Sequence, residues 1–197
     1  MITSHLELTH GCARGFTWLH LSDLHVGQTS QDRLLPRFQA NLASDLEALV
    51  GRVGKPFDLV IFSGDLVQQG AAEEFAQFDE TIERILDQIG RFQSRPKVLT
   101  VPGNHDLVRP RSLDPSAIAI KQYWRDEALQ EAFWAVDGEP YRDFIATSFA
   151  NYTEWRKSAI KRGVHLEPYR EGILPGDASY QLCTKDGQLG VAALNSA

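Results

Sequence analysis

The sequence contains little cysteine and no signal for export or membrane insertion. Its 197 residues include two cysteines, Cys12 and Cys183, which lie far apart and follow no metal-binding or disulfide spacing. The first residues lack the basic and apolar regions of a signal peptide, and no run approaches the roughly 18 apolar residues of a membrane span. We therefore expect a cytoplasmic protein with no disulfide framework and no membrane partner.

The sequence also lacks an excess of positive charge, internal repeats and low-complexity segments. Acidic residues outnumber basic ones, 26 to 20, and the formal net charge is −6. This balance argues against a broad nucleic-acid surface, although a local basic groove leaves nucleic acid possible as a partner. The length and the 43% hydrophobic content suit one domain, so we expect a single domain over residues 1–197.

Three short apolar runs alternate with helical patterns in the first half of the chain. The runs begin at Phe16, Phe57 and Lys97 and read FTWLHLS, FDLVIFS and KVLTV. Between them, leucine, isoleucine and phenylalanine recur every three or four residues over 35–49 and 75–89, which predicts two helices. The β-α-β-α-β order predicts the α/β class, with a parallel sheet and right-handed crossovers.

The second half of the chain predicts helices followed by a hairpin. Residues 114–136 and 139–163 each predict one aromatic-rich helix, and we expect 107–175 to form a helical insertion or cap. The aromatic side chains fit a core better than a base-stacking platform. Strands at Ala178–Thr184 and Leu189–Leu194 flank a predicted Asp-Gly turn. Because the chain stops directly after the second strand, we expect it to be the N-terminal part of a longer polypeptide.

Each of the first three apolar runs ends in polar residues. The first ends in SDLH, and the second and third are followed by SGD and PGNHD. Because ligands bind beyond the carboxyl ends of the strands in an open parallel sheet, we expect these groups to converge on one crevice. Turn formation and helix capping are the alternative explanation for Asp and Asn at these places, but three coincident strand ends are difficult to explain in that way.

The side chains expected in the crevice suit a pair of metal ions. Asp23 and His25 are two residues apart, so they point to the same side of an extended chain. A carboxylate with an imidazole suits Zn, Mn or Fe better than Ca. Asp65 has two oxygens with which to bridge two ions, and Asn104 offers a neutral oxygen. Two divalent ions with so few anionic ligands keep a positive charge, which attracts a phosphate despite the acidic protein.

Three further polar residues have more than one interpretation. His105 is expected to donate a proton or a hydrogen bond to a phosphate oxygen or a leaving group, with a purely structural role as the alternative. Asp106 is expected to orient His105 or to hold the turn. His165 is a further candidate ligand, but it follows no predicted strand, so a structural role is favoured.

The strings SDLH, SGD and PGNHD, in this order and with helix-sized spacing, resemble the first three motifs of the calcineurin-like metallophosphoesterases. The resemblance implies an α/β/β/α sandwich, truncated here, with two divalent metal ions. It implies that Asp23 and His25 bind the first ion, that Asp65 bridges both ions and that Asn104 binds the second. His105 is then the catalytic histidine beside the ions, and a metal-activated hydroxide attacks phosphorus.

The resemblance is incomplete toward the C-terminus. The family has further histidines, among them a Gly-His-x-His motif, whereas this chain contains no Gly-His pair. We expect the remaining ligands beyond Ala197, and weak metal binding by this chain alone. The resulting hypothesis is a metal-dependent hydrolase of phosphate mono- or diesters at the front of a larger bacterial protein. A catalytically impaired binding or regulatory module, and a nuclease of the DNA-repair type suggested by SDLHVG, are the alternatives.

Overall fold

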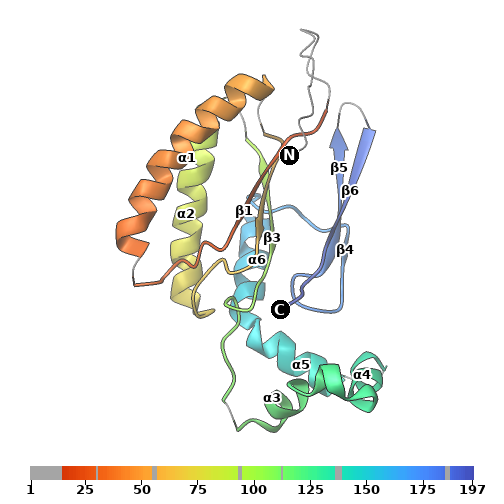
Figure 1. The fold of residues 1–197 in the computed structure, drawn as a ribbon. Helices are drawn as coiled ribbons and strands as arrows, with labels where there is room; N and C mark the ends of the chain where they lie inside the picture. The colour runs from red at the N-terminus through yellow and green to blue at the C-terminus, as the bar shows by residue number, and fades with distance from the viewer. Residues whose placement is uncertain are drawn as a thin grey trace, which may run out of the picture.

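Two β-sheets stacked face to face form the centre of the molecule, and helices cover the outer face of one of them (Figure 1). The computed structural model describes residues 15–29, 31–54, 57–92, 95–111, 113–135, 139–184 and 187–197. Cys12, and Asp186 of the predicted turn, lie outside these residues. The expected α/β class is confirmed.

The first sheet is parallel and contains β1 (Trp18–Ser22), β2 (Leu59–Ser63) and β3 (Lys97–Val101), in that order. Ser22 pairs with Ser63, and Ser63 pairs with Val101, so the three strands end at the same level. The strands follow the three predicted apolar runs closely. Their carboxyl ends therefore open onto one common edge of the sheet.

One face of the parallel sheet is covered by α1 (Gln31–Val53), α2 (Ala72–Gly90) and α6 (Ala150–Lys161). The predicted spacing of apolar residues in the first two helices is confirmed, since this spacing places one apolar stripe against the sheet. The buried side chains of this layer come from every one of these helices and from the strands, and include Leu46, Phe78, Ile82, Tyr152, Val60 and Phe62.

The second sheet is antiparallel and contains β4 (Arg170–Glu171), β5 (Ala178–Thr184) and β6 (Gly187–Ala193). Alternate residues of its strands face the parallel sheet, as the period of a strand requires. The core between the sheets contains the buried residues Leu59, Leu99, Ala178, Tyr180 and Ala193. The predicted bounds of β5 are those of the structure, whereas β6 begins two residues before the predicted start and ends one residue before the predicted end.

The prediction of one helix over 114–136 is wrong. The segment is divided into α3 (Pro115–Ile120), a 3-10 turn η1 (Tyr123–Arg125) and α4 (Glu127–Trp134). The cause lies at Asp126, whose backbone is extended and whose carboxylate accepts a hydrogen bond from a backbone N–H three residues later. An aspartate in this role starts a new helix rather than continuing the previous one.

The prediction of one helix over 139–163 is also wrong. It is divided at Phe149, where ψ is 16° and the helical path is interrupted between α5 (Glu139–Ser148) and α6. The ring of Phe149 is buried in the core beneath the helices. The interruption allows α6 to pack on the parallel sheet while α5 projects beyond the strand ends (Figure 1).

The region expected to be an insertion, 107–175, therefore holds two kinds of structure. Its α6 belongs to the helical layer of the core and its β4 belongs to the second sheet, whereas α3, η1, α4 and α5 form a separate group, the helical lobe (Figure 1). Tyr152 and Trp155 of α6 are buried, as the core interpretation predicts, but Trp124 and Trp134 of the helical lobe are 86% and 53% exposed. None of the described helices combines the length and apolar character needed to cross a membrane.

Candidate metal centre

The first two strand-end loops are joined by backbone hydrogen bonds. The N–H of Asp23 donates to the carbonyl of Gly64 at 3.1 Å, and the N–H of His25 donates to the carbonyl of Asp65 at 2.8 Å. The N–H of Gly64 in turn donates to the carbonyl of Val101, at the end of β3. These bonds continue the pairing of the parallel sheet into the loops, so the loops are held at fixed positions relative to one another.

Three candidate ligands have a left-handed backbone. The φ angles of Asp23, His25 and Asp65 are 57°, 45° and 50°. Residues other than glycine adopt this backbone conformation at a cost on the order of 1–3 kcal/mol each. They keep it only where the surrounding structure requires it. The strain falls on the polar residues that follow the strand ends, so the backbone leaves the extended path of a strand at these positions.

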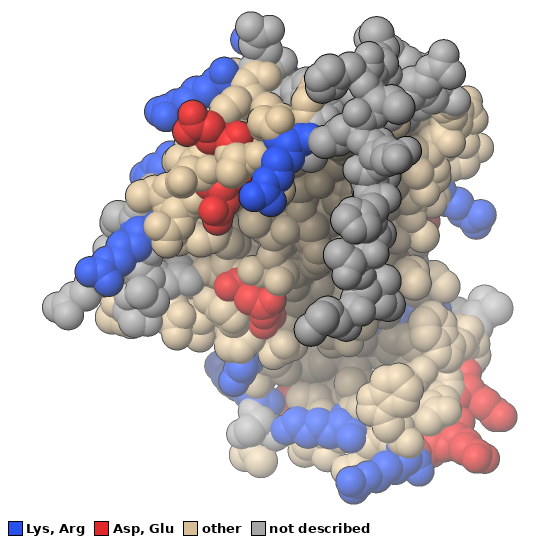
Figure 2. Space-filling view, turned by 45° about the horizontal axis from the view of Figure 1, so that its top comes forward, with Lys and Arg blue, Asp and Glu red and all other residues tan. Residues whose placement is uncertain are grey.

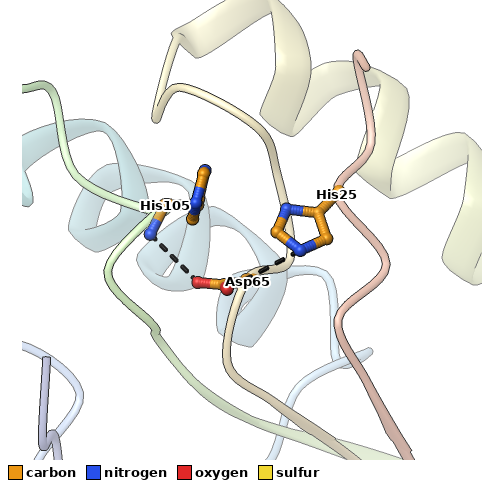
Figure 3. Close-up of side chains that lie close together, drawn as sticks. All are labelled: His25, Asp65 and His105. Atoms are coloured by element: carbon orange, nitrogen blue, oxygen red, sulfur yellow. Dashed lines mark hydrogen bonds and ion pairs between the residues drawn. The ribbon is translucent and has the colours of Figure 1, made fainter. Parts of the chain in front are cut away.

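His25, Asp65 and His105 come together at this edge, one from each loop (Figure 3). One potential ligand atom from each lies within 4.8 Å of the others. The Nε2 atom of His25 lies 3.7 Å from Oδ2 of Asp65, and the two imidazole rings meet edge to face with centroids 4.8 Å apart. The predicted convergence of the three strand ends is therefore present in the fold.

The chemistry of this cluster fits a divalent cation. Two imidazoles and a carboxylate are ligands that Zn, Mn and Fe accept. The Nδ1 atom of His25 is buried and has no hydrogen-bond partner among the described residues. Buried polar atoms are rarely left unpaired, because losing water without a replacement costs free energy. The unpaired nitrogen is thus consistent with a histidine that is shaped for a bound ligand.

His105 is fixed by two contacts with the second loop. Its backbone N–H donates to Oδ1 of Asp65 at 3.0 Å, and its Nδ1 lies 2.8 Å from the carbonyl oxygen of Gln68. Because a carbonyl only accepts, Nδ1 carries the proton in this contact. The other ring nitrogen, Nε2, is then the atom through which His105 can bind a ligand or exchange a proton.

Asp106 is fully buried and joins the second and third loops. Its carboxylate accepts hydrogen bonds from the backbone N–H groups of Val67 at 2.8 Å and Gly103 at 2.7 Å. Burial raises the pKa of Asp106 to about 6, although these two hydrogen bonds act in the opposite direction. Of the two roles expected for Asp106, the structure shows contacts that hold the turn.

Asp23 and Asn104 are the two remaining predicted ligands. Both are exposed, and the carboxylate of Asp23 is not among the ligand atoms that lie within 4.8 Å of one another. Asn104 lines a pocket of about 440 Å³ together with Asp65, Gly103 and the end of β6. Of the six predicted site residues, the structure therefore gathers His25, Asp65 and His105 closely, buries Asp106 between the second and third loops, leaves Asp23 outside the close group and places Asn104 in a pocket with Asp65.

Comparison with models of protein families identifies the family to which this fold and site belong. The model of the calcineurin-like phosphoesterases matches residues 16–178. The chain belongs to this family. The two-sheet α/β fold agrees with it, and membership places the chain among metal-dependent phosphoester hydrolases. A comparison with curated proteins gives no match.

Two glycines of the calcineurin-like site were not singled out by sequence reasoning. A Cβ atom at Gly103 would lie 2.4 Å from the backbone nitrogen of Asp65, so the third loop can approach the second only without a side chain there. A Cβ atom at Gly27 would lie 2.7 Å from Oε1 of Glu74. The signal in the sequence is the position of each glycine, one directly before Asn104 and one two residues after His25.

Glu74 was also missed, although it supports the first two loops. Its carboxylate accepts hydrogen bonds from the backbone N–H groups of Gln69 and Ala71, at 2.8 and 3.2 Å, and its side chain packs against Gly27. A glutamate at the third position of a helix often turns back to the chain in this way. The signal was the acidic pair at the start of α2.

His165 lies away from the cluster. It is buried beside β3, where its Nε2 accepts a hydrogen bond from the backbone N–H of Thr100 at 3.0 Å and its Nδ1 lies 2.7 Å from the carbonyl of Leu166. Burial lowers the pKa of His165 to about 4, so the ring is neutral at physiological pH. These contacts agree with the structural role that was favoured for it.

Proposed function

We propose that the chain hydrolyses phosphate mono- or diesters with two divalent ions, Mn, Fe or Zn, at the ends of β1, β2 and β3. Asp23 and His25 would hold one ion, Asp65 would bridge both, and Asn104 would hold the second. The observation that carries the proposal is the convergence of His25, Asp65 and His105 from three loops. The left-handed backbone at three of the proposed ligand and bridging positions adds support, because strain of this kind gathers at functional sites.

The ions, when bound, supply positive charge to the phosphate and activate water for attack. The residues of the chain supply orientation and a proton. Because Nδ1 of His105 is engaged with the carbonyl of Gln68, Nε2 is the ring nitrogen left for proton exchange. We infer that His105, when protonated, donates through Nε2 to a phosphate oxygen or to the leaving oxygen. Asp106 keeps the turn that carries His105 in place.

The surface favours a small phosphoester as the substrate. On the face shown in Figure 2, basic and acidic side chains of the described residues are interspersed rather than gathered by sign. The pocket of about 440 Å³ beside Asp65 and Asn104 has the size of a small-molecule site. A cytoplasmic location and further ligands beyond Ala197 stay predictions.

The substitution Asp65→Asn tests the proposed centre. Mn²⁺ binding is measured by titration calorimetry, and hydrolysis is measured with p-nitrophenyl phosphate and bis-p-nitrophenyl phosphate in the presence of Mn²⁺. We expect turnover to fall by about 100- to 1,000-fold, as for loss of a central electrostatic group, and Mn²⁺ affinity to fall with it. The matched control is Asp45→Asn, which makes the same change on an exposed position of α1 and is expected to leave both quantities unchanged.

Two results would contradict the proposal. Unchanged turnover in Asp65→Asn would remove Asp65 from the bridging role. Mn²⁺ binding that depends on Asp65, without turnover of either ester by a protein that also carries the ligands expected beyond Ala197, would favour the binding or regulatory module over the enzyme.

A further inference from the structure

The loop between β4 and β5, loop 172–177, contains none of the candidate ligands, yet it touches the third strand-end loop. Gly176 is buried and has a φ of +91°. A Cβ atom at this position would lie 2.3 Å from Cδ of Pro102 and 2.8 Å from its Cγ. Pro102 is also buried and directly precedes Gly103 and Asn104. The second sheet therefore reaches the candidate metal centre through a contact for which only glycine has room.

Loop 172–177 is closed on itself by Asp177. The N–H of Gly172 donates to the backbone carbonyl of Asp177 at 2.7 Å, and the N–H of Leu174 donates to Oδ2 of Asp177 at 3.2 Å. The N–H of Asp177 donates back to the carbonyl of Leu174 at 2.9 Å. A loop with this many internal hydrogen bonds is rigid, so its contact with Pro102 can fix the position of that residue.

The same loop holds the residues that follow β6. Oδ1 of Asp177 accepts a hydrogen bond from the N–H of Asn195 at 2.6 Å, and the side chain of Asn195 donates to the carbonyl of Pro175 at 2.8 Å. Directly after Asn195, Ser196 lines the pocket that also contains Asp65 and Asn104. The pocket therefore has two walls that contact loop 172–177. The first contains Pro102 and Asn104, and the second contains the residues after β6.

We propose that loop 172–177 is a positioning element of the metal centre. Gly176 sets the place of Pro102 and hence of Asn104 and His105, and Asp177 sets the opposite wall through Asn195. The catalytic consequence rests on the proposed function, but the placement of the two walls is a property of the chain alone. Loop 172–177 would thus belong to the metal centre although it carries no ligand and comes from the antiparallel sheet.

The substitution Gly176→Ala is the main test, made in the full chain. We expect the backbone amide NMR signals of residues 103–105 to shift in the metal-free protein, and Mn²⁺ affinity to fall about 10- to 100-fold, as for other groups that orient metal ligands. The matched control is Gly54→Ala. Gly54 also has a positive φ, of +69°, but no atom of the described residues lies within 4 Å of its added Cβ, so this variant has the strain without the contact.

Rescue separates positioning from a general loss of stability. Pro102→Ala removes the ring atoms that the new Cβ would meet, so the double variant Gly176→Ala, Pro102→Ala is expected to bind Mn²⁺ more tightly than Gly176→Ala alone. For the second wall, Asp177→Ala is expected to shift the amide signals of residues 195–197.

The outcomes distinguish this inference from the proposed function. Unchanged amide signals at 103–105 in Gly176→Ala, an equal loss in Gly54→Ala, or no recovery in the double variant would overturn the inference, whether or not the wild type hydrolyses esters. Shifted signals and weakened Mn²⁺ binding would support the inference even in a chain without turnover, and turnover is then judged in a protein that also carries the ligands expected beyond Ala197.

Discussion

The parallel and antiparallel sheets share a core, but they bury their strands differently. The strands β2 and β3 are covered on both faces, by the helices and by the second sheet, whereas β5 and β6 bury only one face among the described residues. A strand with both faces covered has no place for exposed polar side chains along its length. Its polar residues gather at its end instead, and this explains why candidate ligands follow β2 and β3, whereas β1 has exposed residues along its length as well.

The two sheets also differ in backbone strain. Among the described residues, the non-glycine residues with a left-handed backbone are Asp23, His25 and Asp65, and all three follow strands of the parallel sheet. The loop of the antiparallel sheet uses glycine for its positive φ, at Gly176. The two sheets thus differ in role. The parallel sheet carries the candidate ligands on a strained backbone, and the antiparallel sheet contacts their loops through a glycine.

The largest expected difference between the two sheets comes from adding a methyl group to a glycine of each. Gly103→Ala places a Cβ atom 2.4 Å from the backbone nitrogen of Asp65, where backbone must move. Displacements near 1 Å at a site cost about 100-fold in activity, so we expect at least this loss in turnover. Gly190→Ala in β6 meets no atom of the described residues within 4 Å, and its effect on the free energy of unfolding is expected to stay within about 0.5 kcal/mol.

Ester hydrolysis and thermal melting of both variants check this prediction. A Gly103→Ala protein with wild-type turnover would show that the close approach of the loops is unnecessary. A large loss in Gly190→Ala would contradict the view that the outer face of the second sheet is tolerant.

A pH titration of stability tests the junction between the sheets, where His165 lies. The pKa of its ring is about 4 in the folded protein and near 6.5 in the unfolded chain. As the pH falls below 6.5, the unfolded chain binds the proton first, so stability is lost between pH 6.5 and 4. The loss reaches about 3 kcal/mol at 1.36 kcal/mol for each tenfold change in proton affinity.

His165→Gln isolates this contribution. The raised pKa of Asp106 acts in the opposite direction over part of the same range, because the folded protein then binds a proton more readily than the unfolded chain. Both proteins contain Asp106, so the difference between their urea-unfolding free energies reports His165. Parallel pH profiles for the two proteins would show that His165 is not buried as a neutral ring.

The smallest expected effect comes from relieving strain in one loop. Asp23→Gly removes a side chain from a left-handed backbone and is expected to stabilise the metal-free protein by about 0.5–1 kcal/mol, while removing a proposed ligand. Ser22→Gly, one residue earlier in β1, is the control and is expected to destabilise by a similar amount. Urea unfolding of the metal-free variants provides the measurement, and destabilisation by Asp23→Gly would argue against stored strain.

Local patterns in the sequence predicted the parallel sheet and the convergence of its strand ends. Each apolar run there is bounded by turn residues, and parallel pairing brings equivalent ends together without further information. The helical lobe was harder, because Asp126 and Phe149 interrupt stretches whose apolar spacing looks continuous. Whether a residue caps a new helix or continues the old one depends on packing that apolar spacing does not contain.

Long-range contacts set a similar limit at the site. The motifs identified residues whose chemistry is visible in their own type, such as His25 and Asp65. Gly176 has no such chemistry, and its role depends on its contact with Pro102, which lies far away in the sequence. The pair of strained backbones at Asp23 and His25 was likewise not foreseen, because an extended chain was assumed there.

The contact between Gly176 and Pro102 also has a consequence for the order in which the protein is made. At about 5–20 residues per second, the ribosome finishes Gly176 roughly 4 to 15 seconds after Pro102. During this interval the nascent chain already contains Asp23, His25, Asp65 and His105, but not the loop that fixes their neighbour. The candidate ligands therefore exist before their final arrangement, and a loop that is made later completes it.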